Sequence, residues 1–216
     1  MLVDRARPPR FGALLASIVV LYILIIALGR STVAVPLRVL VLAAALMLAA
    51  RVAGRRDQSR AALAVALAAI VLSVVAVTAG GDRLATGLTS AATVTLACAT
   101  IAATAQTVVR RDRVDIQAVA GALATYLLLA LVFSNLHQLI AAILGNPYLT
   151  NVDRADDASA FLYFSVITLT TVGYGDIVPA SNAARAIAVA EAITGQLYLV
   201  SVVAAVVARW RPRGQA

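Results

Sequence analysis

A seven-residue stretch in the last third of the chain combines residue types that can bind a dehydrated cation. In order, its residues are Thr170, Thr171, Val172, Gly173, Tyr174, Gly175 and Asp176. A cation that leaves water needs oxygen atoms to replace its hydration shell, since an unpaired ion in a medium of low dielectric constant is very costly. Backbone carbonyl groups supply such oxygens without adding net charge, so the stretch predicts a cation site.

The two glycines of this stretch indicate how its carbonyl groups become aligned. A normal strand turns successive carbonyls to opposite sides, so unusual backbone angles are required, and glycine adopts them at low steric cost. We also expect the Val172 and Tyr174 side chains to point away from the ions and pack against the preceding helix. The expected ligands are the Thr171 hydroxyl, at the inner end, and the carbonyls of Thr171, Val172, Gly173 and Tyr174.

A short apolar segment, Ala158–Thr170, leads directly into this stretch. At about 13 residues it is too short to cross a bilayer core of about 30 Å as a helix. It is therefore predicted to be a re-entrant helix. Turn-forming residues end the apolar run before it, and residues that can cap a helix lie at its start. These are Gly145, Asn146, Pro147, Asp156, Asp157 and Ser159.

The stretch resembles the selectivity filter of the potassium channel family, in which TVGYG carbonyls replace the hydration shell of potassium. The resemblance covers roughly Ala158–Ala208. It implies potassium as the permeant ion, no organic cofactor, and Gly175 and Asp176 as filter support. One chain carries one filter strand, so the resemblance also implies a homotetramer with the pore on its axis. A less selective cation channel stays an alternative. One departure is Ile167, which replaces a Glu that partners the filter Asp in some bacterial members.

The apolar run after the filter is expected to line the pore below it. Gly195 lies 24 residues after Thr171 and matches the hinge glycine of the family's inner helix. Close helix packing through a small residue is the other interpretation. Helical spacing places four further residues on one face. The resemblance implies that this face lines the pore cavity below the filter; the other interpretation is a stripe that faces lipid or packs against another helix. They are Gln196, Leu199, Val203 and Val207.

The composition indicates that all these elements lie in a membrane. Of the 216 residues, 62% are hydrophobic and only 13% are charged, whereas an ordinary soluble domain is about 45–50% apolar and about 25% charged. Each of six apolar runs is long enough for a spanning helix. We predict an all-α membrane protein with two domains, residues 1–113 and 114–216. The runs are Phe11–Leu28, Ser31–Ala50, Ala61–Ala79, Leu84–Val109, Ile116–Leu144 and Ala186–Ala208.

The positions of the arginines predict the orientation. Alternate connections and both termini hold thirteen arginines, and the other connections hold three, apart from Arg185 beside the last apolar run. By the positive-inside rule both termini lie in the cytoplasm, so the basic residues are topology signals and nucleic-acid binding is not expected. A cell-membrane location follows, and Ala- and Arg-rich usage without Lys suggests a bacterial inner membrane. The thirteen are Arg5, Arg7, Arg10, Arg51, Arg55, Arg56, Arg60, Arg110, Arg111, Arg113, Arg209, Arg211 and Arg213; the three are Arg30, Arg83 and Arg154.

The few other polar residues argue against catalysis and against voltage sensing. The chain has one His, one Glu and one Cys, which provide no paired carboxylates, no nucleophile with a base and no thiolate metal site. The fourth run has no Arg or Lys, so the first domain has the topology of a voltage sensor without its charges. Glu191 is expected to make a buried hydrogen bond, and a contact with His137 is possible. No regulatory ligand is predicted.

Overall fold

The computed structural model of the protein describes residues 11–28, 34–53, 56–78, 82–109, 116–144, 147–152 and 154–209. Within these ranges the chain forms α-helices and one isolated β-bridge. The all-helical class predicted from the sequence is therefore confirmed. The helices are α1 (Phe11–Leu28), α2 (Ala34–Ala53), α3 (Arg56–Thr78), α4 (Asp82–Val109), α5 (Ile116–Leu144), α6 (Ala158–Leu169) and α7 (Asn182–Arg209).

Several predicted boundaries differ from these. The third helix begins at Arg56 and the seventh at Asn182, both earlier than the apolar runs suggested. Hydropathy marks only the apolar part of a helix, whereas the first turns of both helices contain polar residues. Ser181 caps α7, because its Oγ accepts the N–H of Ala184 at 3.1 Å. Gly145, Asn146, Asp153 and most of the arginines used for the orientation lie outside the described residues.

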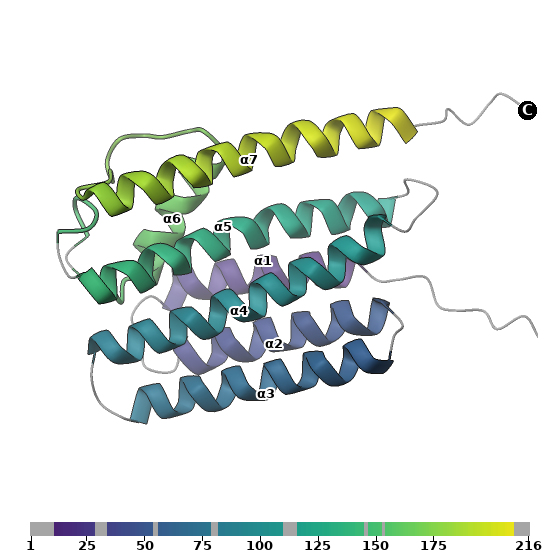
Figure 1. Ribbon diagram of the computed structural model, residues 1–216, viewed down its shortest axis with the longest axis horizontal. Coiled ribbons are helices and arrows are strands. Elements are labelled where there is room, and N and C mark those ends of the chain that lie inside the picture. Colours follow the sequence, from purple (N-terminus) through teal and green to yellow (C-terminus); the bar gives the residue numbers. More distant parts are fainter. Residues whose placement is uncertain are drawn as a thin grey trace, which may run out of the picture.

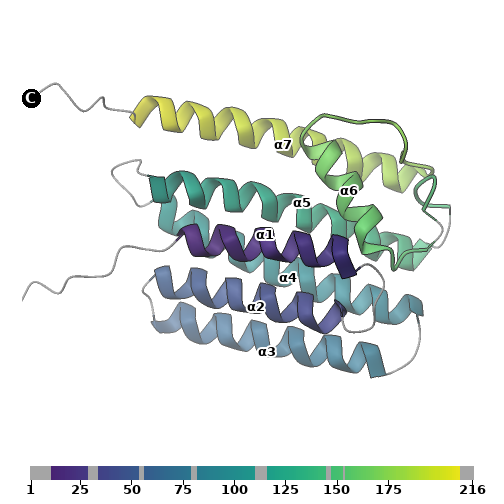
Figure 2. The ribbon, with the colours of Figure 1, turned by 180° about the vertical axis from the view of Figure 1, so that it is seen from behind.

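The long helices lie side by side, and α6 lies across the end where α5 stops and α7 starts (Figure 1). The fourth helix, α4, packs against α2, α3 and α5, while α1 packs against α2, α5 and α6. Figure 2 shows α1 and α6 from the opposite side. Among the described residues, α7 packs only on α5 and α6. Much of the surface of α7 is therefore not covered by its own chain.

Five helical segments are long and apolar enough to cross a membrane. The described part of α2 is not among them. Together they support a multi-pass membrane protein. The segments are Phe11–Leu28, Ser59–Ala76, Arg83–Gln106, Ile116–Leu144 and Asn182–Val202.

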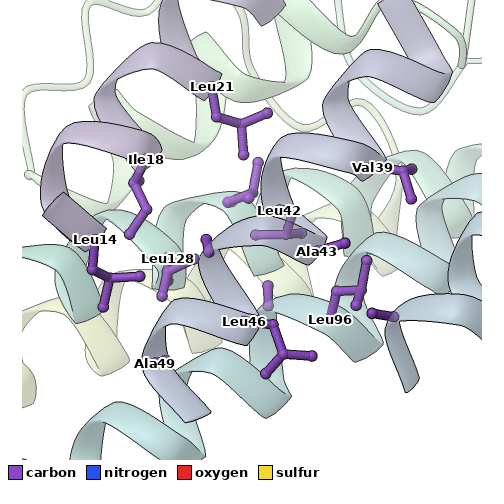
Figure 3. Close-up of a cluster of buried hydrophobic side chains, with 14 of the residues drawn as sticks. Leu14, Ile18, Leu21, Val39, Leu42, Ala43, Leu46, Ala49, Leu96 and Leu128 are labelled. Carbon is purple, nitrogen blue, oxygen red and sulfur yellow. The ribbon is translucent and has the colours of Figure 1, made fainter. Parts of the chain in front are cut away.

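The larger of two hydrophobic clusters joins α1–α4 to α5 and α6. Leu14, Ile18 and Leu21 recur every three or four residues, which places them on one face of α1. They meet Leu42 of α2 and Leu128 of α5 (Figure 3). Alanines fill much of the remaining interface, and small residues of this kind allow the close helix approach that drives packing in membranes. The first four helices are thus packed against α5 and α6 through a shared core.

The hydroxyl groups of α4 are satisfied within the helix itself. Thr89, Thr93, Thr100 and Thr104 each donate to the carbonyl four residues earlier, at 2.7–2.8 Å. This pattern removes the cost of placing a polar group in an apolar environment. The helix can therefore carry many threonines and still pack closely within a membrane.

Candidate functional site: the re-entrant segment and its anchors

The short helix α6 begins at a well-formed cap. Asp157 is its N-cap residue, and its Oδ1 accepts from the Ala160 N–H at 3.2 Å and from the Ser159 hydroxyl at 2.7 Å. The sequence predicted capping here, and both Asp157 and Ser159 take part. Asp156 instead pairs with Arg154 at 2.9 Å on an exposed surface. Such a pair contributes little to stability.

The end of α6 turns its last carbonyl groups toward the predicted filter. The Thr171 N–H donates to the Thr168 carbonyl at 3.0 Å, and the Val172 and Gly173 N–H groups both donate to Ile167, at 2.8 and 3.2 Å. These bonds satisfy carbonyls that would otherwise lack partners at a helix C-terminus. They also fix the filter amides toward α6, which leaves the opposite side for the carbonyls.

The filter backbone alternates between left- and right-handed conformations. Thr171 has φ 60°, Gly173 has φ 52° and Gly175 has φ 82°, whereas Val172 and Tyr174 have no positive φ. Alternating handedness turns successive carbonyls to the same side, unlike the alternation of a normal strand. The two glycines behave as the sequence argument requires. Thr171 was missed, since a β-branched residue rarely adopts positive φ.

The Val172 and Tyr174 side chains are largely exposed when one chain is considered alone. Their exposed fractions are 51% and 74%. Packing of these two side chains against the preceding helix stays a prediction.

The Asp176 end of the predicted filter is held by α6 and by the segment that follows α5. The Tyr163 hydroxyl donates to Asp176 Oδ2 at 2.8 Å, and the Asn151 amide donates to the Asp176 carbonyl at 2.6 Å. The Glu expected by family comparison is absent at Ile167, yet Asp176 has Tyr163 as a partner instead. The sequence analysis did not predict the pair of Tyr163 and Asp176, although the position of Tyr163 on α6, 13 residues before Asp176, could have suggested it.

A short ladder continues this connection. Thr150 and Val178 exchange two hydrogen bonds at 2.9 Å, and the Ala180 N–H donates to the Tyr148 carbonyl at 3.0 Å. Leu149 and Pro179 form an antiparallel bridge between them. We call Tyr148–Asn151 together with residues 176–180 the filter rim.

Glu191 and His137 meet in the interior, which confirms the possible contact. Both side chains are fully buried, and His137 Nε2 lies 3.3 Å from Glu191 Oε2. His137 Nδ1 lies 2.9 Å from the Tyr148 hydroxyl. The histidine therefore connects α7 to the filter rim.

The inner end of the filter has a second close contact with α7. Gly195 is buried, and a Cβ atom there would lie 2.6 Å from the Leu169 carbonyl oxygen. The same carbonyl accepts the Tyr126 hydroxyl of α5 at 3.0 Å. Close packing thus explains this glycine, and hinge bending remains a prediction. The other predicted pore residues follow on α7: Gln196 and Leu199 are exposed, while the side chains of Val203 and Val207 lie outside the described set.

A cavity of about 70 Å³ is lined by residues of α1, α2, α4 and α5 and of the start of α6. Arg38 lines it, donates to the Ile25 carbonyl at 3.5 Å and is attracted by the Asp157 carboxylate. The sequence interpretation found no acidic residue for Arg38 to step past within the first four spans. The acidic residue that attracts Arg38 lies at the cap of α6. Thr86, Ser90, Thr93, Ser134, Asn135, Gln138 and Asp156 also line the cavity.

Comparison with known proteins agrees with this geometry. Residues 121–211 match a family described as "Ion channel". Over 46 residues the chain is 56% identical to two pore potassium channel b of Oryza sativa subsp. japonica, a stretch covering 21% of this chain and only 12% of that relative. No solved structure matches significantly. The two matches support a potassium channel family.

Gly173→Ala should strongly reduce potassium flux through the protein in liposomes. A Cβ at Gly173 meets no atom within 4 Å, so the cost is the backbone at φ +52°, roughly 1–2 kcal/mol per chain for a left-handed conformation. Gly12→Ala is the matched control, because Gly12 also has open space but no positive φ. Equal flux in both variants would show that this backbone is not required.

Gly195→Ala should also reduce flux, by displacing the Leu169 carbonyl from the base of the filter. Gly87→Ala serves as control, since its Cβ would meet Leu139 and Ala142 only at ordinary distances of 3.8 and 4.0 Å. A hinge role predicts slower gating with unchanged selectivity, whereas the packing role predicts altered selectivity. Single-channel recordings in a potassium/sodium gradient separate the two.

Proposed function

We propose that this chain, whose residues 121–211 match an ion channel domain, is the subunit of a potassium-selective channel that conducts passively. The observation that carries the proposal is the alternation of positive and negative φ from Thr171 to Gly175. It presents carbonyl oxygens on one side, while the amide groups of Val172 and Gly173 are bonded to α6. A dehydrated potassium ion needs such a ligand set.

The proposed binding sites are successive layers of oxygen atoms. The Thr171 hydroxyl and carbonyl form the inner layers, and the carbonyls of Val172, Gly173 and Tyr174 form the layers above. Neutral carbonyl dipoles stabilise a cation while still allowing it to leave, which conduction requires. Asp156 and Asp157 lie at the N-terminus of α6, and Asp153 precedes them. In the proposal these carboxylates raise the local cation concentration at the mouth.

Four copies around one axis would complete each layer. A single chain supplies only one strand of ligands, and cyclic symmetry suits identical chains. The exposed Val172 and Tyr174 side chains support this assembly, as does an uncovered stripe on α7. That stripe is available to a neighbouring copy or to lipid, and Gln196, Leu199, Val203 and Val207 would face the conduction path. The stripe comprises Val189, Ile193, Leu197 and Val200.

The proposed topology has six spans and a re-entrant α6. At 12 residues α6 is about 18 Å long, well short of the bilayer core. It lies at the end where α5 stops and α7 starts (Figure 1). We take α2 as the sixth span, since it lies beside α1, α3 and α4. The arginine pattern then orients both termini toward the cytoplasm.

The first domain, residues 1–113, is proposed to support the pore rather than sense voltage. Apart from Arg83 in its first turn, α4 has no basic residue. Arg38 of α2 is held by the Ile25 carbonyl and attracted by Asp157. A charge restrained at both sides has little freedom to cross the field.

Selectivity is tested by the reversal potential of purified channels in liposomes under a potassium/sodium gradient. A selective filter should give a reversal potential close to the potassium equilibrium value. Barium, a divalent ion of similar size, should block the current. Equal permeability to the two ions would instead favour a less selective cation channel with the same architecture.

Open probability should vary only weakly with voltage. Steep gating uses about 3–4 charges per subunit, each worth about 2.3 kcal/mol per 100 mV, and the fourth span supplies none. The measurement is a conductance–voltage curve in symmetric potassium. It is repeated after neutralising Arg110, Arg111 and Arg113, which lie outside the described residues. A steep curve flattened by these changes would identify a working sensor.

A further inference from the structure

A chain of buried side chains connects α7 to the filter rim. It consists of Glu191 on α7, His137 on α5 and Tyr148 in the rim, and we call it the buried relay. Exposed fractions are 0% for Glu191 and His137 and 1% for Tyr148. The two contacts measure 3.3 Å between Glu191 Oε2 and His137 Nε2, and 2.9 Å between His137 Nδ1 and the Tyr148 hydroxyl. The Phe164 ring packs edge-on against the imidazole at 5.1 Å.

An ionised Glu191 sets the direction of the hydrogens in the relay. Its carboxylate accepts the Nε2 hydrogen of a neutral His137, which leaves Nδ1 to accept the Tyr148 hydroxyl hydrogen. Burial raises the pKa of Tyr148, so this hydroxyl stays protonated. A neutral imidazole that accepts at Nδ1 carries its hydrogen on Nε2. That hydrogen faces Glu191 Oε2. The relay therefore runs from the rim through the imidazole to α7.

The surroundings provide no other charge to balance Glu191. Among the described residues its titratable neighbours are His137 on α5, Tyr148 in the rim and Tyr22 on α1. Ser165 of α6 lies beside the carboxyl. Even so, Glu191 Oε1 and Ser165 Oγ are both buried without a hydrogen-bond partner. With a neutral imidazole and an ionised Glu191, the pair carries one net negative charge. Burying a net charge is costly, so the pair readily takes up one further proton.

The rim end of the relay is bonded to the filter exit. The Tyr148 carbonyl accepts the Ala180 N–H at 3.0 Å. Three residues further on, Asn151 donates to the Asp176 carbonyl at 2.6 Å. At the other end Glu191 lies one helical turn before Gly195, which contacts Leu169 below the filter. A movement of α7 is therefore transmitted to both ends of the filter.

We propose that Glu191 and His137 are positioning residues that hold the filter rim in its conducting conformation through Tyr148, and that protonation of this pair weakens the hold. An imidazolium donates at both nitrogens and accepts at neither. An added proton would thus reverse the bond at Nδ1 and leave the Tyr148 hydroxyl hydrogen without its acceptor. Acid pH then lowers open probability. This inference rests on the proposed potassium channel function and adds its regulation.

The test uses the full-length channel in lipid bilayers, with the pH changed equally on both sides. Glu191→Leu removes the acceptor of the imidazole N–H, and open probability should fall about tenfold, as expected for an unsatisfied buried donor. Glu191→Gln offers an amide oxygen in its place and should restore most of the activity. His137→Gln combined with Glu191→Gln keeps an acceptor and a donor but cannot titrate. This double variant should conduct without the acid response.

Asn135→Leu is the matched control, because Asn135 is also a buried polar residue of α5 but donates only within its helix, to Leu131 at 2.9 Å. It should keep the acid response of the wild type. An acid response that survives in the double variant would overturn the proposal. The proposal would also be overturned if Glu191→Leu channels formed in lower yield but gated normally, because this result would mark a purely structural role for Glu191. Wild-type channels that do not select potassium over sodium would instead refute the proposed function.

Should Glu191→Leu fail to assemble, the pH profiles of the two glutamine variants still decide the matter.

Discussion

The backbone of residues 171–175 is the constraint on which the surrounding structure depends. Its alternating φ values include a β-branched residue, Thr171, in a conformation that such residues rarely adopt. Residues held in sparsely populated conformations persist only when neighbouring groups restrain them. The hydrogen bonds from the Val172 and Gly173 N–H groups to the Ile167 carbonyl restrain this backbone on one side. Contacts at the two ends of the stretch provide the remaining restraint.

These end contacts explain residues that are otherwise unusual in a membrane helix. At the inner end, Leu169 accepts the Tyr126 hydroxyl and approaches the backbone of Gly195. At the outer end, Asp176 binds Tyr163, and the rim is held by Tyr148. Both α5 and α7 therefore contribute at each end, either directly or through the imidazole of His137. A Glu within a membrane is costly, and Glu191 is the residue through which α7 contacts His137.

The sequence was most informative where one chain determines the structure locally. The bounds of α1 and α5 were predicted correctly, since their apolar runs have clear ends. The glycine conformations followed from the need to align carbonyls. By contrast, Tyr163 and Tyr148 were missed as anchors, because their partners Asp176 and His137 are chosen by tertiary packing. Where the Val172 and Tyr174 side chains pack stays a prediction, because both are largely exposed in a single chain.

The exposure of these two side chains indicates how the filter and the assembly depend on each other. A tyrosine with 74% exposure and a valine with 51% exposure leave the outer side of the filter without packing. In the proposed tetramer these side chains contact the neighbouring copy and become buried there. This burial would stiffen the filter backbone, which one chain alone restrains on one side only. Binding that favours one conformation stabilises it by mass action. Assembly would therefore complete the restraint on Thr171, and the strained conformation would reach its full occupancy only in the oligomer.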